Sequence, residues 1–171
     1  MRGTMTISFA FLLSAALIAI DRVVKSWVLS NLAPVGTIPL IPGILKLTYV
    51  ENYGAAFGIL HGKRMLLLLV TGAIIAAACW LLLSKRLTHP AAVLCTSLII
   101  AGGTGNLIDR AMYGFVVDYI DINELFSYPM FNFADCCVVI GAVLLAYYAL
   151  VIEGRQKQAG PKAEEKPEGK A

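Results

Sequence analysis

Three aspartates in the second half of the chain, Asp109, Asp118 and Asp135, stand beside long apolar segments. This placement predicts that all three lie at or near the edge of a lipid bilayer. An ionisable group at that depth costs a few kcal/mol unless it is paired, hydrated or protonated. Because that cost calls for a compensating purpose, the three residues together predict a functional site.

Asp118 and Asp135 are the pair that could carry out a reaction. The connection between them is long enough to bring their carboxyl groups face to face. Two neighbouring carboxylates cannot both ionise cheaply, so they share one proton. One can then act as a base on water while the other acts as an acid on a scissile carbonyl, which is aspartic-protease chemistry and requires no metal or cofactor. The spacing also allows a second interpretation, in which these aspartates form structural ion pairs with Arg110 or Lys25.

Polar and small residues accompany these aspartates at helical spacing. Asn106 and Asp109 are three positions apart and share a helix face, and Asn132 and Asp135 have the same spacing. Asn132 could also cap a helix whose first turn contains Asp135, and capping is compatible with catalysis. The glycine-rich segment 102–105 would let a neighbouring helix approach closely.

Other reaction templates fit the sequence poorly. The chain has no GxSxG motif, and Ser26 follows Lys25 directly, so these side chains point in different directions on a helix. Two histidines without an HExxH motif do not indicate a metal-dependent hydrolase. The four cysteines fall in apolar segments without CxxC or metal-site spacing, which predicts reduced thiols packed inside helices.

The composition indicates an integral membrane protein. Of 171 residues, 58% are hydrophobic and 15% are charged, and the mean hydropathy is +0.76. Soluble domains carry about 25% charged residues. The length suits a single domain. Basic residues are scattered rather than arrayed with aromatic residues, so nothing indicates nucleic-acid binding.

Four segments are long and apolar enough to cross a bilayer, which takes about 20 residues per helix. They cover about 6–29, 65–83, 91–106 or slightly beyond, and 133–152. We predict that the first is an uncleaved helix, because no A-x-A site closes its apolar core. Within it, Asp21 and Lys25 are four positions apart and can form an ion pair.

Two connections and the C-terminal tail complete the predicted architecture. The segment 31–61 contains prolines and then the β-prone ILKLTYV (44–50), which predicts a strand or hairpin on the membrane surface. The segment 110–131 predicts a short amphipathic helix on the interface. Residues 155–171 are charged and poor in apolar side chains, which predicts a disordered cytoplasmic tail after a membrane domain covering 1–154.

The distribution of charge predicts an orientation. With four spans, both termini lie on the same side. Placing Arg2, Lys85, Arg86 and the basic tail in the cytoplasm agrees with the positive-inside rule, in which the long first loop counts for less. All the aspartates considered above then gather near the extracytoplasmic face.

Five motifs give the chain a family resemblance. They are DRVVK (21–25), ENYGAAFG (51–58), GGTGNLIDR (102–110), VVDYI (116–120) and FNFADCCVVIG (131–141). With these motifs in this order and four spans of fitting length, the chain resembles the bacterial lipoprotein signal peptidases, or signal peptidase II. The match covers nearly the whole chain apart from the tail.

The resemblance implies an all-α integral membrane protein with four transmembrane helices, a small extracytoplasmic β-cradle and a short interfacial helix. It also implies an aspartic endopeptidase of the bacterial cytoplasmic membrane that is sensitive to globomycin and uses no cofactor. Its substrates would be prolipoproteins, cut just before a cysteine that carries diacylglycerol. The expected partners are these substrates and membrane lipid, without nucleic acid, and the expected state is a monomer.

By the same resemblance, Asp118 and Asp135 are the catalytic dyad. The family's other characteristic positions are occupied by Asp21, Lys25, Asn52, Gly54, Asn106, Asp109, Arg110, Asn132 and Ala134. Within that set, Asn52 and Arg110 would bind the substrate backbone, and the other two asparagines would orient the dyad.

The main alternative function is a small proton-coupled transporter that uses intramembrane carboxylates. Transporters commonly hold such groups near the bilayer midplane and are built from internal repeats. In this sequence the carboxylates gather toward one interface and no repeat is visible, which favours the peptidase. A non-catalytic helical interaction protein would leave the carboxylates without a purpose.

Overall fold

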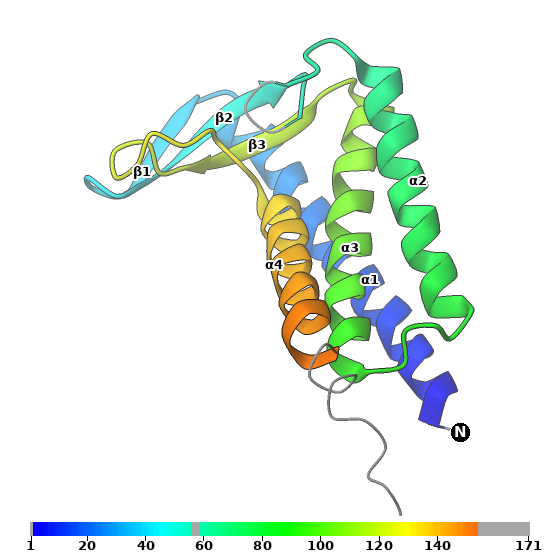
Figure 1. Cartoon of the computed structure of the whole chain (residues 1–171). Helices are drawn as coiled ribbons and strands as arrows, with labels where there is room; N and C mark the ends of the chain where they lie inside the picture. Colours follow the sequence, from blue (N-terminus) through cyan, green and yellow to red (C-terminus); the bar gives the residue numbers. More distant parts are fainter. Residues whose placement is uncertain (1, 56–58, 154–171) are drawn as a thin grey trace, which may run out of the picture.

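The computed structural model describes residues 2–55 and 59–153. Its helices form an elongated body, and a small sheet lies across one end of that body (Figure 1). The helices are α1 (Arg2–Trp27), which continues as the π-helical η1 (Val28–Leu32), α2 (Arg64–Leu83), α3 (Pro90–Met112) and α4 (Phe133–Tyr147), which continues as the π-helical η3 (Tyr148–Glu153). The predicted tail, 155–171, lies outside the described residues.

The prediction of four membrane spans is confirmed. The candidate spans in the described residues are Ile7–Leu32, Arg64–Leu83, Pro90–Met112 and Phe133–Val151. The third span is longer than predicted, because α3 continues through the polar segment 106–110 to Met112. Helix is retained there because Asn106, Asp109 and Arg110 are buried and have polar partners on neighbouring elements.

Helix α3 is the centre of the bundle and contacts α1, α2 and α4. In its most apolar window 56% of the residues are buried, against 17% in each of the other three spans. Glycines allow this close packing. A Cβ on Gly102 would collide with the carbonyl oxygen of Ala134 in α4, and a Cβ on Gly141 would lie 2.7 Å from the carbonyl oxygen of Cys95.

Replacing Gly102 by alanine should lower the melting temperature of the protein in detergent, because the added methyl group forces α4 away from α3. Overpacking of this kind costs about 1–3 kcal/mol. Gly72 in α2 provides the matched control, since a Cβ there meets no atom within 4 Å. Gly72→Ala should therefore leave the melting temperature unchanged or slightly raised. Equal melting temperatures for the two variants would contradict the close α3–α4 contact.

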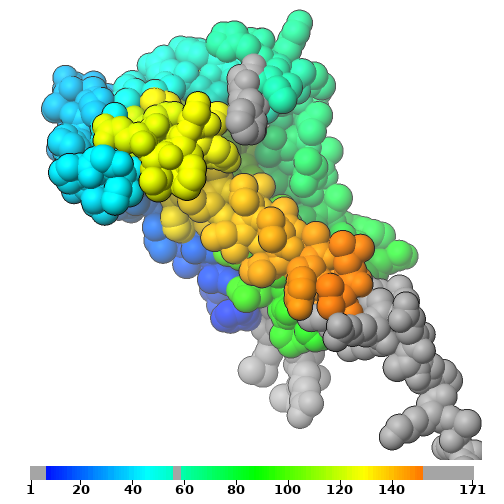
Figure 2. Space-filling view, turned by 60° about the vertical axis from the view of Figure 1, so that its left-hand side comes forward, coloured from blue at the N-terminus to red at the C-terminus, as the bar shows by residue number. Residues whose placement is uncertain are grey.

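The sheet contains β1 (Thr37–Ile41), β2 (Leu45–Asn52) and β3 (Val116–Asp121), antiparallel in the order β1-β2-β3. The predicted hairpin before the second span is therefore confirmed. The sheet projects sideways from the bundle beyond α4 (Figure 1). In the space-filling view, the segment between β3 and α4 (yellow) lies against the hairpin (cyan) and leads into α4 (orange) (Figure 2).

The predicted interfacial helix within 110–131 is wrong. After α3 ends, the chain forms β3, and all residues from 122 to 132 are described and non-helical. The sequence VVDYID favours a strand because β-branched and aromatic residues alternate with aspartates. Val117 and Tyr119 pack on the end of the first span, so Asp118, on the opposite face of the strand, points away from that core.

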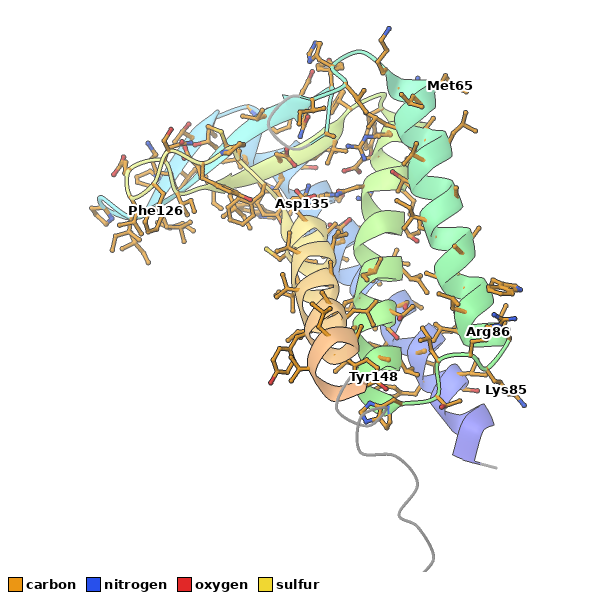
Figure 3. All side chains as sticks on the ribbon, in the orientation of Figure 1. Met65, Lys85, Arg86, Phe126, Asp135 and Tyr148 are labelled. Carbon is orange, nitrogen blue, oxygen red and sulfur yellow. The ribbon has the colours of Figure 1, made fainter. Side chains whose placement is uncertain are left out.

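The two ends of the bundle differ in their side chains. Asp135 lies where the sheet meets α4, whereas Phe126 lies near the outer end of the sheet, away from the bundle (Figure 3). Lys85, Arg86 and Tyr148 lie at the opposite end of the bundle, which is also the end where α1 begins (Figures 1 and 3). The aspartates singled out in the sequence thus belong to the sheet end, and the basic loop belongs to the other.

Candidate active site

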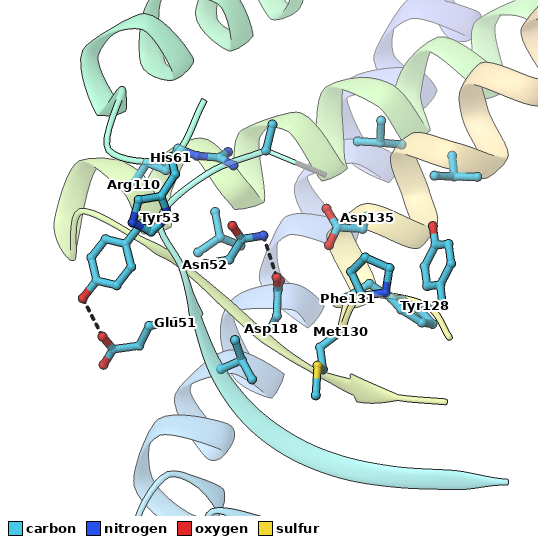
Figure 4. A pocket seen from close by; sticks show the side chains of 16 residues that line it. Glu51, Asn52, Tyr53, His61, Arg110, Asp118, Tyr128, Met130, Phe131 and Asp135 are labelled. Carbon is cyan, nitrogen blue, oxygen red and sulfur yellow. Dashed lines mark hydrogen bonds between the residues drawn. The ribbon is translucent and has the colours of Figure 1, made fainter. Parts of the chain in front are cut away.

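Asp118 and Asp135 line one cavity between the sheet and the helices (Figure 4). Asp118 lies in β3 opposite Val50 of β2, and Asp135 lies in the first turn of α4. The cavity has a volume of about 580 Å³. Its other lining residues are Val50, Glu51, Asn52, Tyr53, Ala55, His61, Arg110, Val116, Tyr128, Pro129, Met130, Phe131, Val138 and Val139. Strand pairing and a helix start therefore bring together two carboxyl groups that are distant in the sequence.

Asparagine amides hold both carboxyl groups. Asn132 Nδ2 and Asn52 Nδ2 donate to the two oxygens of Asp118, at 2.6 and 2.8 Å. Asn106 Nδ2 donates to Asp135 Oδ1 at 2.7 Å. The predicted capping turn is also present: Asn132 N donates to Asp135 Oδ2 at 3.1 Å, while Asp135 N donates to Asn132 Oδ1 at 2.9 Å. Capping and orientation of the carboxyl group are thus properties of the same turn.

The alternative of structural ion pairs is wrong for both aspartates. Among the described residues, no lysine, arginine or histidine nitrogen lies within 4 Å of an Asp118 or Asp135 oxygen. Lys25 contacts Asp109 at 2.7 Å and Asp21 at 3.2 Å instead, which confirms the predicted pair within the first span. The two cavity carboxyls are therefore available to share a proton, which a tight salt bridge to either would oppose.

The pKa of Asp118 is shifted toward neutral pH. Burial raises its pKa to about 7, and repulsion by the Asp135 carboxylate adds to the shift. Hydrogen bonds from Asn52 and Asn132 and the more distant charge of Lys25 lower the pKa and only partly offset this rise. Asp118 therefore keeps its proton in conditions where an exposed aspartate has lost it.

Arg110 and the loop after β2 form another part of the cavity wall. One guanidinium nitrogen of Arg110 donates to the carbonyl oxygen of Gly54 at 2.8 Å, and Gly54 N donates to Asn52 Oδ1 at 2.9 Å. The Nε atom of Arg110 is buried and has no partner within the described residues. Ala134 is buried where its methyl group faces the bare Cα of Gly105.

Four of the predicted site residues line the cavity, namely Asn52, Arg110, Asp118 and Asp135, and the other seven lie outside its lining. Asp21 and Asp109 belong to a buried ion cluster between α1 and α3, together with Lys25. Arg22 is the fourth member, and sequence reasoning missed it, although it stands inside the DRVVK motif. Its nitrogens contact Asp21 Oδ2 and Asp109 Oδ1, both at 2.7 Å. The contact to α3 could not be inferred from helical spacing, which relates only residues of the same helix.

A second, mostly apolar pocket of about 330 Å³ adjoins the first along α4. Sequence reasoning did not identify it. Ile122, Tyr128 and Phe131 form one wall, and Cys136, Val139 and Ile140 form the other, with Asp135 shared between the two pockets. Val139 and Ile140 are about half exposed, at 55% and 51%. Exposed apolar side chains of α4 therefore lie beside Asp135 in this pocket.

Comparison with known proteins gives a consistent result. The profile described as signal peptidase II matches residues 13–151. Proteins named lipoprotein signal peptidase are similar to this chain in Clostridioides difficile strain 630 (45% identity, 82% of this chain and 94% of the relative) and in Moorella thermoacetica strain ATCC 39073 (39% identity, 85% and 96%). A third, from Clostridium acetobutylicum strain ATCC 824, is 38% identical over 81% of this chain and 92% of its own length.

Solved structures extend the similarity to the fold. One bacterial membrane enzyme has a TM-score of 0.76 at 30% identity, with 93% of this chain and 94% of that chain covered. Another has a TM-score of 0.73 at 32% identity, with 84% and 93% covered. Matches in profile, sequence and fold each cover most of the chain, and the range matched by the profile, 13–151, includes Asp118 and Asp135. The chain belongs to the signal peptidase II family.

Proposed function

We propose that this protein removes signal peptides from prolipoproteins by aspartic catalysis, with Asp118 and Asp135 as the catalytic dyad. The observation that carries the proposal is that two carboxyl groups face one cavity, held by asparagine amides and unpaired with any described cation. Family membership agrees with this function and gives no support to the proton-coupled transporter. The protein is a multi-pass protein of the bacterial inner membrane.

The two aspartates would divide the chemistry between them. Asp118, with its raised pKa, holds the proton, and Asp135 is the ionised partner. Asp135 removes a proton from water as the water oxygen attacks the scissile carbonyl carbon, and Asp118 donates its proton to the carbonyl oxygen. When the tetrahedral intermediate collapses, Asp118 recovers that proton and Asp135 passes the other to the departing amine nitrogen. No metal or redox partner enters the balance.

Supporting roles follow from the contacts. Asn106 and Asn132 orient the dyad, as does Asn52 through its hydrogen bond to Asp118. Arg110 is suited to bind a substrate carbonyl oxygen, because its buried Nε donor lacks a described partner. The predicted contact of Asn52 with the substrate backbone would use the same amide that now holds Asp118.

The surroundings of the dyad suit a lipid-modified substrate. We infer that the sheet lies on the extracytoplasmic surface and that both termini are cytoplasmic, with Lys85 and Arg86 on the inner side. The signal peptide and the diacylglyceryl chains would then approach through the bilayer. The apolar pocket beside α4 is the entry for the acyl chains, and it ends at Asp135.

The rate of cleavage should fall as the pH rises through about 7, since Asp118 must be protonated to donate to the carbonyl oxygen. Below that pH the group carries its proton, and above it each further pH unit should reduce kcat/KM about tenfold. Asn52→Ala removes a hydrogen bond that lowers the Asp118 pKa, so the fall should move to higher pH. A pH profile measured with both proteins that shows no shift, or a shift to lower pH, would contradict Asp118 as the proton donor.

A gel-mobility assay tests the function itself. Purified protein in detergent is mixed with a diacylglyceryl-modified prolipoprotein, and conversion to the shorter form is followed with and without globomycin. Conversion that globomycin blocks is expected. An unchanged substrate, with protein that is folded by its melting curve, would contradict the proposed function.

A further inference from the structure

A single residue, Asn106, connects the buried ion cluster between α1 and α3 to the dyad. It contains two carboxylates, Asp21 and Asp109, and two cations, Arg22 and Lys25. Lys25 and Asp109 are almost fully buried, with side-chain exposures of 1% and 0%. Charges at this depth are tolerated only when they are paired and balanced. The cluster is therefore sensitive to the loss of any one member.

Lys25 connects this cluster to the dyad through Asn106. Its Nζ contacts Asp109 Oδ2 at 2.7 Å and donates to Asn106 Oδ1 at 2.9 Å. Asn132 Nδ2 donates to the same oxygen at 3.2 Å. Because Asn106 Oδ1 accepts from both, its Nδ2 group is turned toward Asp135, to which it donates at 2.7 Å. One amide orientation satisfies all these contacts, and Lys25 helps to select it.

Arg22 balances part of the charge of the two carboxylates, which leaves Lys25 able to donate to Asn106. Its guanidinium contacts one oxygen of each carboxylate, Asp21 Oδ2 and Asp109 Oδ1, and also donates to the carbonyl oxygen of Gly105 at 3.2 Å. Lys25 already contacts both carboxylates, Asp109 at 2.7 Å and Asp21 at 3.2 Å, while it donates to Asn106. Without Arg22, the cluster would carry one uncompensated negative charge. In a medium of low dielectric that charge would pull the ammonium closer to the carboxylates and away from the neutral Asn106 oxygen.

We infer that Arg22 is a positioning residue for the dyad, which acts on Asp135 through Lys25 and Asn106. With Arg22 removed, the Asn106 amide is free to turn its carbonyl oxygen toward Asp135, where it repels the carboxylate and no longer fixes it. Arg22, Lys25 and Asn106 do not line the cavity, so this change should affect turnover rather than binding. The inference rests on the proposed catalytic role of Asp118 and Asp135.

The test compares three variants in the cleavage assay. Arg22→Gln should lower kcat by about 10- to 100-fold with KM changed less than about twofold, since a misplacement of about 1 Å at a catalytic group can cost about 100-fold. Arg22→Lys keeps the charge but not the two-pronged contact, so its kcat should lie in between. Asp21→Asn combined with Arg22→Gln restores charge balance and should recover most of kcat relative to Arg22→Gln alone.

Melting temperatures show whether each variant folds, and the kinetic constants of the folded variants then test the inference. A wild-type kcat for Arg22→Gln would overturn the inference. So would a lowered kcat that Asp21→Asn fails to raise, or a rise in KM that equals the fall in kcat/KM. If Arg22→Gln does not fold, the charge-balanced double variant and Arg22→Lys still decide the matter through their kcat values. Failure of the wild-type protein to cleave would count against the proposed function instead.

Discussion

Replacing either Asp118 or Asp135 by asparagine should reduce the rate of signal-peptide cleavage by about 1,000-fold or more, while the protein still folds and enters the membrane. Asparagine has nearly the shape of aspartate but cannot exchange a proton. General acid and general base contributions are each worth about 100- to 10,000-fold, and each variant removes one of them. The measurement is kcat/KM on a diacylglyceryl-modified prolipoprotein.

Asp121→Asn is the matched control for these two variants. Asp121 lies at the end of the same strand as Asp118, but its carboxylate accepts from Thr48 and Asn123 and does not line the cavity. Its replacement should change the rate by only a few-fold. Near-normal turnover by Asp118→Asn or Asp135→Asn would remove that residue from the dyad.

The diacylglyceryl-modified prolipoprotein should be cleaved at least about 100-fold faster than the same chain without lipid. Burying acyl methylene groups contributes about 0.8 kcal/mol each, so partial contact of two chains outweighs a few polar contacts with a peptide. Each 1.4 kcal/mol corresponds to about tenfold. The apolar pocket along α4 offers such contact directly beside Asp135.

Two substrates matched in sequence, measured by kcat/KM in the same detergent, test this expectation. Ile140→Asn provides a structural check, because Ile140 lines the apolar pocket but not the cavity that holds the two carboxyl groups. It should slow the modified substrate and leave the unmodified one unaffected. Equal rates for the two substrates would show that the peptide sequence positions the scissile bond.

The sequence was a good guide wherever one local signal determined the structure. Length and hydropathy were sufficient for four spans, and the β-prone segment 44–50 overlaps β2, which covers Leu45–Asn52. The segment 110–131 was misassigned because its apolar residues fit a helical period as well as a strand. Pairing with β2, which lies far away in the sequence, decided for the strand. Local propensity alone contains no information about that partner.

In the candidate site, too, the sequence predicted what local spacing determines and missed what depends on contacts between elements. Aspartate and asparagine at helical spacing predicted the turn that holds Asp135, and the motifs brought Asp118 into consideration. The sequence could not decide between a shared-proton pair and structural ion pairs, because that depends on which carboxylates Lys25 reaches across the bundle. Arg22 and the apolar pocket were missed for a similar reason, since both depend on contacts between elements.

The mass of the cleavage products is the most direct test of the account. Purified protein is incubated with a diacylglyceryl-modified prolipoprotein in the presence of EDTA, and the products are identified by mass spectrometry. We expect one cut, just before the modified cysteine. Wild-type protein should make it at an undiminished rate, and it should be absent when Asp118 or Asp135 is replaced by asparagine. A cut elsewhere, or activity that EDTA abolishes and zinc restores, would contradict cleavage by an aspartic dyad.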